Sequence, residues 1–581
     1  MPLQNADIAA IFSEIADLLE IQGANPFRVR AYRNAARSIS ELGKSIPEMI
    51  RHDENLKTIR GIGDDLAGKL REISVSGKCA LLETLHREMP TAVSELLQIQ
   101  GLGPKRVRAI HDALHVDTIE QLQHAARAGR IRALPGFGEK TETHIIASIE
   151  ARLKKSRRFS IAFAEQYAEP LLAHLKAAGD VSEAIVAGSF RRRAETVGDL
   201  DILVAARNAS AVTQRFVHYE DVAEVLSSGA TRSSMVLRNG MQVDLLVVAP
   251  ANYGAALVYF TGSKAHSITM RRMAQERGLK INEYGVFRGD ARIAGDTEAS
   301  VYACIGLPWI TPELRENRGE LQAAATNRLP KLVELADLRG DLHAHTKACD
   351  GRDTLLDMAL AARERGLSYL AITDHSSRLA IAHGLDAKRL ARQIEEIDRL
   401  NRTLEGIVLL KGIEVDILED GQLDLPDDIL ERLDIVVGAV HSRFDLPRRQ
   451  QTERVLRAMD HPCLSILAHP TGRLIGRREP CDIDIERVIR KARARGCHLE
   501  LNAQPDRLDL VDTYCQMAKA EGVLVSIDSD AHSRSGFGNL RHGVDQARRG
   551  WLSRDDVLNT RTLGQLRALL GSAKGVAKVA S

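Results

Sequence analysis

Three aspartates in two apolar segments are the first residues that could carry out chemistry. Asp199 and Asp201 are two residues apart in a segment expected to be a strand, so their carboxylates should lie on one side of it. Neighbouring carboxylates repel each other unless a cation lies between them. Asp244 belongs to a second apolar segment, an unusual place for an unpaired charge. These oxygen ligands predict a site for two divalent cations, Mg²⁺ or Mn²⁺, that clamp the attacking and leaving oxygens of a phosphoryl transfer.

A phosphate-binding loop is expected just before these aspartates. Gly188 and Ser189 follow an apolar segment and open a turn, so backbone N–H groups and the serine hydroxyl can hold phosphate oxygens. Arg192 can neutralise a triphosphate with its guanidinium group. The alternative is that the paired aspartates are solvent-facing residues of an edge strand, but the loop and the third aspartate together favour the metal site.

A second group, of histidines and carboxylates, gathers in the C-terminal part of the chain. His343 and His345 are two residues apart after an expected strand and could chelate one ion together. Imidazole with carboxylate suits Zn²⁺, Mn²⁺ or Fe²⁺. A lone histidine is usually an ordinary polar residue, but several of these follow expected strands and would converge at one end of a barrel. The residues that accumulate there are Asp341, His343, His345, Asp350, Asp374, His375, Glu414, His441, His469, Asp530 and His532.

The elements that must position these groups change along the chain. Residues 1 to about 150 have the apolar spacing of helices, whereas 183–249 contain short apolar runs typical of a mixed sheet with intervening helices. From residue 338 onward, expected strands and helices alternate, which favours a parallel sheet closed into a barrel. The predicted fold class is therefore multidomain, combining a helical N-terminal region with α+β and α/β parts.

Three segments of the helical region share a glycine–apolar–glycine pattern, at 59–63, 99–103 and 134–138. Such glycines let the backbone turn tightly, and the next helix offers N–H groups and a positive dipole to a phosphate. One such pattern is usually a plain turn, but three in a helical region favour contacts that position a duplex without reading its sequence. The residues concerned are Gly61, Gly63, Gly101, Gly103, Lys105, Gly136 and Gly138.

The composition sets outer limits on the class of protein. The chain has 581 residues, enough for several domains, and its formal net charge of +2 does not by itself indicate nucleic acid. Its seven cysteines are scattered without a Cys-x-x-Cys pair, which argues against a disulfide framework and favours the cytoplasm. No apolar run approaches the roughly 20 residues of a membrane helix, so we expect no membrane partner.

The order of these motifs resembles that of a known family. A Gly-Ser-x-Arg-Arg loop, a Gly-Asp-x-Asp strand and a further strand aspartate resemble the palm of family X DNA polymerases, which have a nucleotidyltransferase fold. The glycine segments likewise resemble helix-hairpin-helix motifs. Together with the C-terminal motifs, the resemblance covers essentially the full chain. In the polymerase part the matching segments are 188–192, 198–201, 244, 259–263, 281–285 and 312–316.

The resemblance implies a role for each matching residue. Asp199 and Asp201 would hold both metals, while Asp244 would hold the catalytic metal and help deprotonate the primer 3′-hydroxyl. Ser189 and Arg192 would bind the β and γ phosphates of the incoming nucleotide. The implied nucleotide contacts are Gly188, Ser189, Arg192, Gly198, Tyr259, Phe260, Gly262, Ser263 and Arg271.

Within that set, some residues would face the sugar, the base or the template. The resemblance implies that Tyr259 and Phe260 line the deoxyribose pocket, where close approach of the backbone disfavours a 2′-hydroxyl. Arg271 would face the template strand. Lys264 and Ser267 stand where the best-studied animal pattern has an Asp and an Asn near the incoming base, a departure that leaves the metal site unaffected.

The C-terminal motifs resemble the PHP (polymerase and histidinol phosphatase) domain, most clearly at 372–375, 412–416 and 469–473. That family holds up to three metals, here expected to be Mn²⁺ or Zn²⁺, and hydrolyses phosphoesters with a metal-bound hydroxide. In bacterial family X enzymes this implies a Mn²⁺-favoured 3′–5′ exonuclease and 3′-end phosphatase. Asn502 and Arg507 could contact the substrate. The nine matching ligands are His343, His345, Asp350, His375, Glu414, His441, His469, Asp530 and His532.

Lys69 aligns with the family lysine that forms a Schiff base with a 5′-deoxyribose phosphate. A lysine needs desolvation or a nearby cation to become a nucleophile. Asp65 stands where the animal pattern has a basic residue, and its carboxylate would favour the charged, non-nucleophilic form of the lysine. We therefore expect Lys69 to be an ordinary surface lysine, with lyase chemistry as the alternative.

Both resemblances together predict the domains and the function. The hypothesis is a DNA-directed DNA polymerase that fills short gaps in base-excision or end-joining repair, with a PHP domain that trims 3′ ends. Its partners would be gapped or nicked duplex DNA with a primer 3′ end, and deoxynucleoside triphosphates, and the chain would be a monomer. The predicted domains are an N-terminal helical domain with the first hairpin at 1–80, fingers with two hairpins at 81–150, the palm at 151–255, the thumb at 256–318, a linker at 319–337 and the PHP domain, a distorted TIM-like barrel, at 338–575.

Three alternatives stay open. The first is a template-independent nucleotidyltransferase that acts on RNA or a small molecule. The second is a non-catalytic protein that recognises DNA ends. The third keeps the polymerase but makes the PHP domain a structural metal platform.

Overall fold

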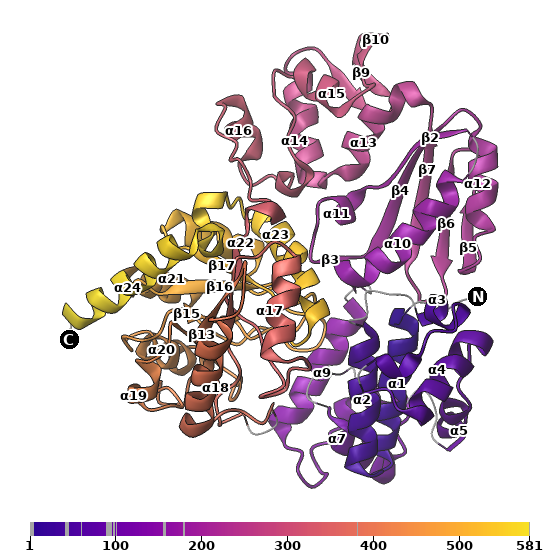
Figure 1. Ribbon diagram of the computed structural model, residues 1–581. Coiled ribbons are helices and arrows are strands. Elements are labelled where there is room, and N and C mark those ends of the chain that lie inside the picture. Colours follow the sequence, from indigo (N-terminus) through magenta and orange to yellow (C-terminus); the bar gives the residue numbers. More distant parts are fainter. Residues whose placement is uncertain are drawn as a thin grey trace.

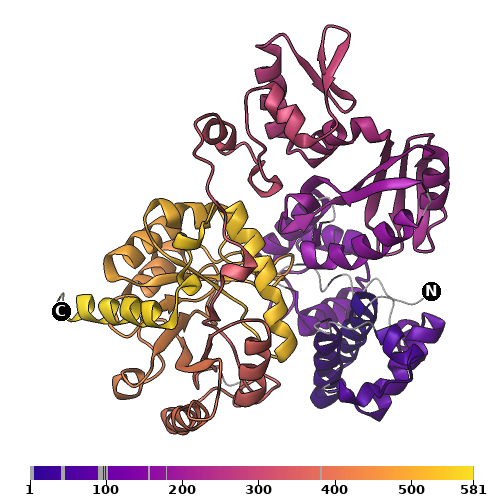
Figure 2. The same ribbon diagram turned by 45° about the horizontal axis from the view of Figure 1, so that its top comes forward.

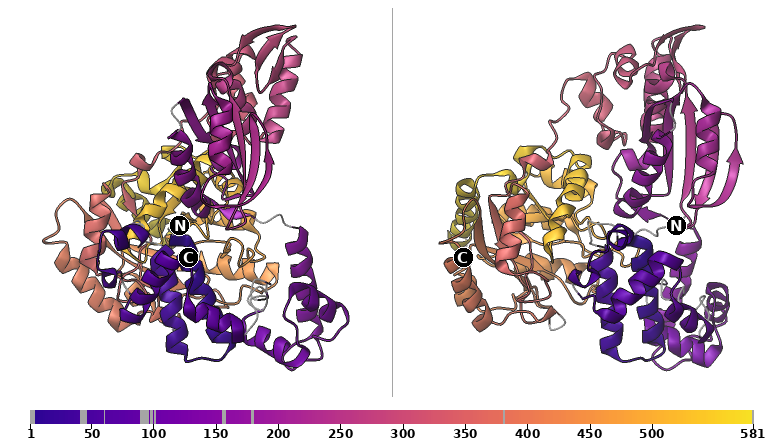
Figure 3. Two further views of the ribbon diagram at one scale, coloured as in Figure 1. Left: turned by 90° about the vertical axis from the view of Figure 1, so that its right-hand side faces the viewer. Right: turned by 45° about the vertical axis from the view of Figure 1, so that its right-hand side comes forward.

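The computed structural model separates the chain into a helical N-terminal region, a palm and thumb, and a C-terminal barrel (Figure 1). Figures 1 and 3 place the N-terminal helices and the thumb at opposite ends of the palm. In the described residues, no helix is long and apolar enough to span a bilayer. The residues that the structure describes are 5–40, 46–59, 61–88, 96, 99, 102–154, 158–177, 180–379 and 382–579.

The helical region has two apolar cores that share α1. Its first core includes Ile8, Phe12 and Ile15 of α1, whereas Ile21 at the end of the same helix belongs to the second core. The apolar spacing of these segments places one side of each helix in a core. The helices are α1 (Asn5–Ile21), α2 (Pro26–Ser40), α3 (Ile46–Arg51), α4 (Asp64–Ser76), α5 (Ala80–Glu88), α7 (Pro104–Leu114), α8 (Ile119–Arg127) and α9 (Glu139–Lys154).

The palm is a five-stranded mixed sheet in the order β2-β4-β7-β6-β5. Its central strands β4 and β7 run parallel, and the other pairs are antiparallel. Alternate strand residues pack against α10 and α12 on one face and α13 on the other. The elements are α10 (Ile161–Lys176), β2 (Val181–Val186), α11 (Gly188–Arg191), β4 (Asp199–Ala206), α12 (Ala209–Val217), β5 (Val222–Ser228), β6 (Arg232–Leu237), β7 (Gln242–Val248) and α13 (Tyr253–Thr261).

The thumb packs two helices against a small three-stranded sheet in the order β10-β9-β8. The segment predicted as a linker contains a helix, and its Leu321 and Ala324 are buried in the thumb core. The elements are α14 (Lys264–Gln275), β8 (Lys280–Asn282), β9 (Gly285–Arg288), β10 (Ala291–Ala294), α15 (Glu298–Cys304) and α16 (Glu320–Ala325).

The C-terminal unit is a seven-stranded parallel sheet in sequential order, β11 to β17, so the predicted βα alternation and barrel are confirmed. A parallel bridge between Ala344 and Ala531 brings its first and last strands together. The strands are β11 (Gly340–Asp341), β12 (Tyr369–Ile372), β13 (Val408–Asp416), β14 (Ile435–Ala439), β15 (Ile466–Leu467), β16 (His498–Asn502) and β17 (Val525–Asp528).

Helices follow the barrel strands and bury the outer apolar side of the sheet. Leu566 and Leu570 of the last helix instead pack against a second apolar cluster of the barrel, which contains Tyr369 and Ile435. The helices are α17 (Leu355–Glu364), α18 (Ala387–Leu400), α19 (Asp427–Leu430), α20 (Arg448–Ala458), α21 (Ile485–Arg495), α22 (Asp512–Ala520), α23 (Leu540–Arg549) and α24 (Leu563–Val579).

The barrel lies directly against the palm, with α23 near the base of the palm (Figure 2). Leu508 of the barrel is 2% exposed and belongs to the apolar core of the palm, and Ile475 packs beside it. Around this apolar contact lies a set of ion pairs between the barrel and the polymerase part. They are Arg193–Asp545, Glu195–Arg473, Glu165–Arg541, Glu313–Arg548, Glu316–Arg549 and Arg318–Asp512.

Candidate active sites in the palm and the barrel

The three palm aspartates meet on the two central strands. Asp201 on β4 lies directly opposite Asp244 on β7, and Asp199 is two residues earlier on the same side of β4. One carboxylate oxygen from each residue lies within 4.8 Å of the others. Ser234 and Gln242 donate hydrogen bonds to Asp244 and fix its orientation. The predicted convergence of these carboxylates is therefore present.

The electrostatics of this cluster fit a cation site. Burial, followed by the nearby carboxylates of Asp199 and Asp244, raises the pKa of Asp201 to about 7. Burial and Asp244 also raise the pKa of Asp199. Such shifts record an uncompensated concentration of negative charge, which divalent cations between the oxygens would relieve.

Gly188 forms the floor beneath the aspartates. Its φ is +59°, and a Cβ atom placed there would lie 2.0 Å from Oδ2 of Asp201. Only glycine allows both this backbone conformation and this approach. Ser189 follows in the single turn α11, and Gly198 precedes β4, so both of these predicted nucleotide contacts flank the carboxylate cluster.

The three consecutive arginines after this loop have different partners. Arg191 donates two hydrogen bonds to Glu298 in the thumb, each 2.8 Å long. Arg192 donates from Nε to Glu316 at 3.0 Å and from Nη1 to the carbonyl of Thr261 at 2.6 Å. Arg191 also donates to the hydroxyl of Thr261 at 2.6 Å, so both arginines are tied to the segment that precedes Gly262, another predicted nucleotide contact. Arg193 instead pairs with Glu165 and Asp545.

The predicted sugar and base contacts lie between α13 and α14. Tyr259 is 42% exposed, and its ring lies 5.7 Å from that of Phe260. Ser263 caps α14 by accepting a hydrogen bond from the backbone of His266. Arg271 is exposed on the same helix, where its Nε donates to the carbonyl of Ser267. Lys264 and Ser267, which depart from the animal pattern, share that helix with Arg271.

The glycine segments repeat one backbone geometry at three places. The N–H groups of Ile62, Leu102 and Phe137 each donate to the carbonyl three residues earlier, at 3.0–3.1 Å. Each of these apolar side chains is buried, whereas the space around the flanking glycines is open. The glycines with open space are Gly61, Gly63, Gly103, Gly136 and Gly138. Gly101 lies outside the described residues, as does the side chain of Lys105.

Two of these glycines begin a helix. Gly63 is the N-cap of α4 and Gly103 is the N-cap of α7, and neither has a side chain that could cover the first N–H groups. These two segments therefore present accessible helix N-termini of the kind that bind phosphate, and Gly138 likewise directly precedes α9.

Lys69 has the environment of an ordinary charged lysine. Its side chain is 17% exposed and pairs with Asp65 one turn earlier on α4. Burial opposes the charged form, but the hydrogen bond to Asp65 and other contacts outweigh it and raise the pKa of Lys69. A nucleophilic lysine needs a shift in the opposite direction.

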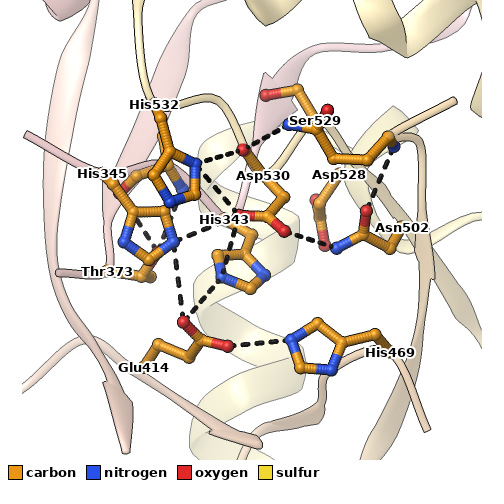
Figure 4. Close-up of polar contacts among 12 residues, drawn as sticks. His343, His345, Thr373, Glu414, His469, Asn502, Asp528, Ser529, Asp530 and His532 are labelled. Carbon is orange, nitrogen blue, oxygen red and sulfur yellow. Dashed lines mark hydrogen bonds and ion pairs between the residues drawn. The ribbon is translucent and has the colours of Figure 1, made fainter. Parts of the chain in front are cut away.

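Predicted barrel ligands, among them His343, His345 and Asp530, lie at the carboxyl ends of the strands and point toward one another (Figure 4). Three groups of them bring their ligand atoms within 4.8 Å, and the groups overlap at His345 and His375. His469 joins them through a 2.9 Å contact between its Nε2 and Oε1 of Glu414. The groups are His345, Asp350, His375 and His532; His343, His345 and Asp530; and His375, Glu414 and His441.

Orphaned polar atoms show that this cluster fits metal ions. Within the described part of the chain, Nε2 of His343, Nε2 of His345 and Nδ1 of His375 are buried without a hydrogen-bond partner. The same three atoms lie 3.4, 3.6 and 2.7 Å from Oε2 of Glu414. Lone pairs that converge without hydrogen bonds around one carboxylate oxygen are suited to shared cations.

Two of the ligands, His345 and Asp530, have the charge states that a metal requires. In His343, His441 and His532 burial opposes the charged form, but nearby carboxylates instead outweigh it and raise the pKa. Burial, with His532 and His375 nearby, lowers the pKa of His345 to about 3, so its ring is neutral and can ligate. Burial opposes ionisation of Asp530, but His343 and the other histidines outweigh it and hold its pKa well below the usual range. Neutral imidazole and ionised carboxylate are the forms that bind metals.

Family models match the chain in the same order as its structural units. The two polymerase models cover the palm site and the thumb, and the PHP model covers the barrel as far as residue 504, before Asp530 and His532. The matches are a helix-hairpin-helix domain at residues 3–79, a SAM-like helix-hairpin-helix tandem at 93–151, the DNA polymerase beta palm at 163–245, the DNA polymerase beta thumb at 256–316 and the PHP domain at 341–504.

A curated relative matches along nearly the whole chain. The protein named DNA polymerase/3'-5' exonuclease PolX of Bacillus subtilis (strain 168) is 37% identical over 573 residues, which are 98% of this chain and 99% of the relative. This chain belongs to the bacterial family X DNA polymerases with a C-terminal PHP domain.

Shorter relatives match a smaller part of this family X chain. A probable phosphatase of Thermoanaerobacter sp. (strain X514) is 28% identical over 245 residues, 40% of this chain and 95% of the relative. A probable phosphatase of Acetivibrio thermocellus is 30% identical over 201 residues, 33% of this chain and 78% of the relative.

Some residues of this family X chain that support the barrel site were not identified as candidates from the sequence. Glu500 is fully buried and accepts hydrogen bonds from Nδ1 of His343 at 2.6 Å and from the backbone of His469 at 2.7 Å. Asp416 accepts from Nδ1 of His441 at 2.8 Å. Both carboxylates lie in apolar strands, which was the available signal. By fixing ring orientation they leave the other nitrogen free for metal.

The expected substrate contacts in the barrel need one correction. Asn502 is fully buried and its amide donates to Asp530 at 3.0 Å, so it supports a ligand and exposes no atom to a substrate. Arg507 is partly exposed and its Nε lies 3.8 Å from Asp530, a position from which it can still meet substrate. In addition, the buried thiol of Cys349 donates a hydrogen bond to Asp374 at 2.8 Å.

Proposed function

We propose that this chain is a DNA-directed DNA polymerase that fills short gaps in duplex DNA and processes the 3′ end with its PHP domain. The observation that carries the proposal is the convergence of Asp199, Asp201 and Asp244 beside the Gly188 loop. The long relative named as a polymerase and 3'-5' exonuclease supports both activities. The proposed pathway is base-excision or end-joining repair, where such gaps arise.

In the palm, each proposed residue has a part in nucleotide addition. Two divalent cations, which we propose to be Mg²⁺ or Mn²⁺, would supply charge stabilisation for the attacking and leaving oxygens. Asp199 and Asp201 would hold both ions, and Asp244 would hold one of them and accept the proton of the primer 3′-hydroxyl. The orientation of Asp244 for this task is set by Ser234 and Gln242.

The nucleotide would lie between the phosphate loop and α14. We propose that Ser189 and Arg192 bind the β and γ phosphates, with Gly188, Gly198, Gly262 and Ser263 lining the phosphate path. Tyr259 and Phe260 would contact the deoxyribose, and Arg271 would face the template. The position of Arg192 between the loop and Thr261 supports this assignment.

In the barrel, the proposed reaction is hydrolysis of a phosphoester at a DNA 3′ end. Up to three ions, proposed as Mn²⁺ or Zn²⁺, would supply a nucleophilic hydroxide and stabilise the leaving oxygen. The nine ligands would hold them, while Glu500 and Asp416 keep the histidine rings in place. The relatives named as probable phosphatases support phosphoester chemistry there.

The hairpins would hold the duplex that both sites use. Open glycines at three helix starts offer N–H groups to the DNA backbone without reading bases. We propose gapped or nicked DNA and deoxynucleoside triphosphates as the partners of a monomeric chain.

A cytoplasmic location agrees with the seven free cysteines. Lyase chemistry at Lys69 is not part of the proposal because of its pairing with Asp65.

The test is a separation of the two activities on one substrate. A 5′-phosphorylated gapped duplex would be incubated with Mg²⁺ or Mn²⁺, with and without deoxynucleotides. Asp199→Ala should abolish nucleotide addition and retain 3′ trimming, and Asp530→Ala should do the reverse. Loss of both activities from either change in a folded protein would overturn the two-site proposal.

Three further measurements address the alternatives and the palm metal site. Equal incorporation with and without a template strand would favour a template-independent nucleotidyltransferase. Absence of Mn²⁺-dependent mononucleotide release from the wild-type chain, with normal gap filling, would leave the barrel a structural platform. Nucleotide addition that survives removal of all divalent cations would contradict the palm metal site.

A further inference from the structure

Arg549, at the end of barrel helix α23, reaches into the polymerase part of the chain. Its Nη1 donates to the backbone carbonyl of Arg192 at 2.8 Å and to Oε1 of Glu316 at 2.9 Å. Its Nη2 donates to Asp512 of the barrel at 2.8 Å. Arg549 is 7% exposed, so these hydrogen bonds are shielded from water and fix the orientation of its guanidinium group.

Arg549 contacts Arg192 by two routes. One is the direct hydrogen bond to its backbone carbonyl. The other passes through Glu316, because the same oxygen that accepts from Arg549 also accepts from Nε of Arg192 at 3.0 Å. The Glu316 carboxylate, shared by the two guanidinium groups, fixes the side chain of Arg192 at its Nε atom.

The remaining contacts of Arg192 leave one end of its guanidinium open. Nη1 donates to the carbonyl of Thr261 at 2.6 Å. Nη2 makes no hydrogen bond to any residue in the described part of the chain. Arg192 is therefore oriented by Glu316 and Thr261 while Nη2 stays available to an anion, the arrangement that a triphosphate contact requires.

The charges of this group are balanced across the boundary between the two parts. Burial opposes ionisation of Glu316, but Arg192 and Arg549 outweigh it and lower its pKa. Asp512, the second partner of Arg549, also lies 3.0 Å from Arg318. Removing Arg549 would thus leave Glu316 with Arg192 alone, and the carboxylate would draw the guanidinium toward itself.

Other ion pairs between the barrel and the polymerase part do not touch Arg192. Arg548, the neighbour of Arg549 on α23, donates to Glu313 at 2.8 Å. Arg541, earlier on α23, donates to Glu165 at 2.6 Å. These two arginines share the helix and the interface with Arg549, so they separate a general interface effect from an effect on Arg192.

We propose that Arg549 is a positioning residue for nucleotide binding in the palm, acting on Arg192 directly and through Glu316. A helix of the PHP domain would then set the affinity of the polymerase site for the triphosphate of its substrate. The inference rests on the proposed function, in which Arg192 binds that triphosphate.

The experiment measures single-nucleotide gap filling against deoxynucleotide concentration at saturating gapped duplex. Arg549→Met should raise the nucleotide KM about tenfold, which corresponds to about 1.4 kcal/mol of binding free energy, and change kcat less than about threefold. Arg541→Met and Arg548→Met should keep the wild-type KM within about twofold. Mn²⁺-dependent 3′ trimming should be unchanged in all three variants, because none lies at the barrel ligands.

Two further variants show whether the effect passes through Glu316. Arg549→Lys keeps the charge but cannot make all three hydrogen bonds, so its KM should lie between those of wild type and Arg549→Met. In a Glu316→Gln background, Arg549→Met should raise KM less than it does in the wild type. The lysine variant also carries the test should the methionine variant not fold.

The outcomes separate this inference from the proposed function. If Arg192→Ala leaves the nucleotide KM unchanged, the nucleotide site itself is wrongly assigned. If Arg192→Ala raises KM but Arg549→Met and Arg549→Lys do not, the positioning role is overturned. An equal rise in KM for Arg548→Met would also overturn it, because the interface as a whole would then be responsible.

Discussion

Arg473 of the barrel and Glu195 of the palm form an ion pair with two hydrogen bonds, of 3.0 and 2.6 Å. Arg473 is four residues after the candidate ligand His469, and Glu195 is six residues after Ser189. The loops of the two candidate sites are thus joined directly. Such a bidentate pair has a defined geometry, so it fixes one loop relative to the other.

Breaking this pair should weaken the attachment of the barrel to the palm. Arg473 is 9% exposed and Glu195 is 32% exposed at their side chains, so we expect Arg473→Met to lower the free energy of unfolding by about 1–2 kcal/mol. Urea unfolding would measure this change in the free energy of unfolding. Combining Arg473→Met with Glu195→Gln should cost less than the sum of the single changes, and strict additivity would contradict the coupling.

Gly188→Ala should disable nucleotide addition selectively. The new Cβ would lie 2.0 Å from Oδ2 of Asp201, so that carboxylate must move away from the proposed ions. We expect a loss of about 100-fold in gap filling, on the order of 3 kcal/mol in the barrier, with 3′ trimming retained. Gly278→Ala is the matched control, because Gly278 also has a positive φ, +67°, but has open space around it. Similar losses in both variants would attribute the effect to backbone strain.

The buried carboxylate that Arg191 contacts should produce a local acid sensitivity. Burial opposes ionisation of Glu298, but Arg191 and Arg315 outweigh it and lower its pKa from 4.5 to about 2. A lowered pKa stabilises the fold above the unfolded value of 4.5, and this contribution is lost as pH falls toward 2. The shift corresponds to about 3 kcal/mol at neutral pH.

Glu298→Gln removes that contribution, so the gap in unfolding free energy between wild type and variant should narrow as the solution is acidified. We expect it to shrink by about 1 kcal/mol between pH 6 and pH 4. Trp309 fluorescence would report the transition, because Nε1 of Trp309 donates to Glu298 at 2.8 Å. A gap that stays constant over this range would contradict the assigned shift.

A negative charge at a hairpin helix start should repel DNA without unfolding the helix. Gly63 is the N-cap of α4 and has open space around it, and aspartate is a favourable N-cap. Gly63→Asp should weaken binding of gapped duplex about tenfold at low salt, and Gly63→Asn, a neutral N-cap of the same size, should weaken it far less. Fluorescence anisotropy at two salt concentrations measures both. Equal losses would point to steric effects instead of phosphate contact.

Periodicity and residue type were enough to predict much of both sites. The two-residue spacing of Asp199 and Asp201 places them on one side of β4, and the barrel histidines follow strands whose ends must meet. The three hairpins were visible because the same glycine–apolar–glycine pattern recurs in each, and its first glycine has a positive φ at Gly61 and Gly136. These features are local, so short stretches of sequence determine them.

The remaining features depend on contacts between distant parts of the chain. Arg549 and Glu316 are 233 residues apart, and no local pattern relates them. Glu500 gives only the weak signal of a charge within an apolar strand. Asn502 was expected to meet substrate, but the depth of β16 buries its amide against Asp530. Contacts between such distant residues form only when the folded domains and strands pack against one another.

The burial of Leu508 in the apolar core of the palm has a practical consequence for dissecting the molecule. A fragment that ends before the barrel would have a cavity in the palm core and an exposed apolar patch on its surface. It should aggregate or unfold at a lower temperature than the intact chain. Expressing the halves separately would therefore give a misleading account of each. Point substitutions in the intact polypeptide are the sound way to assign its activities.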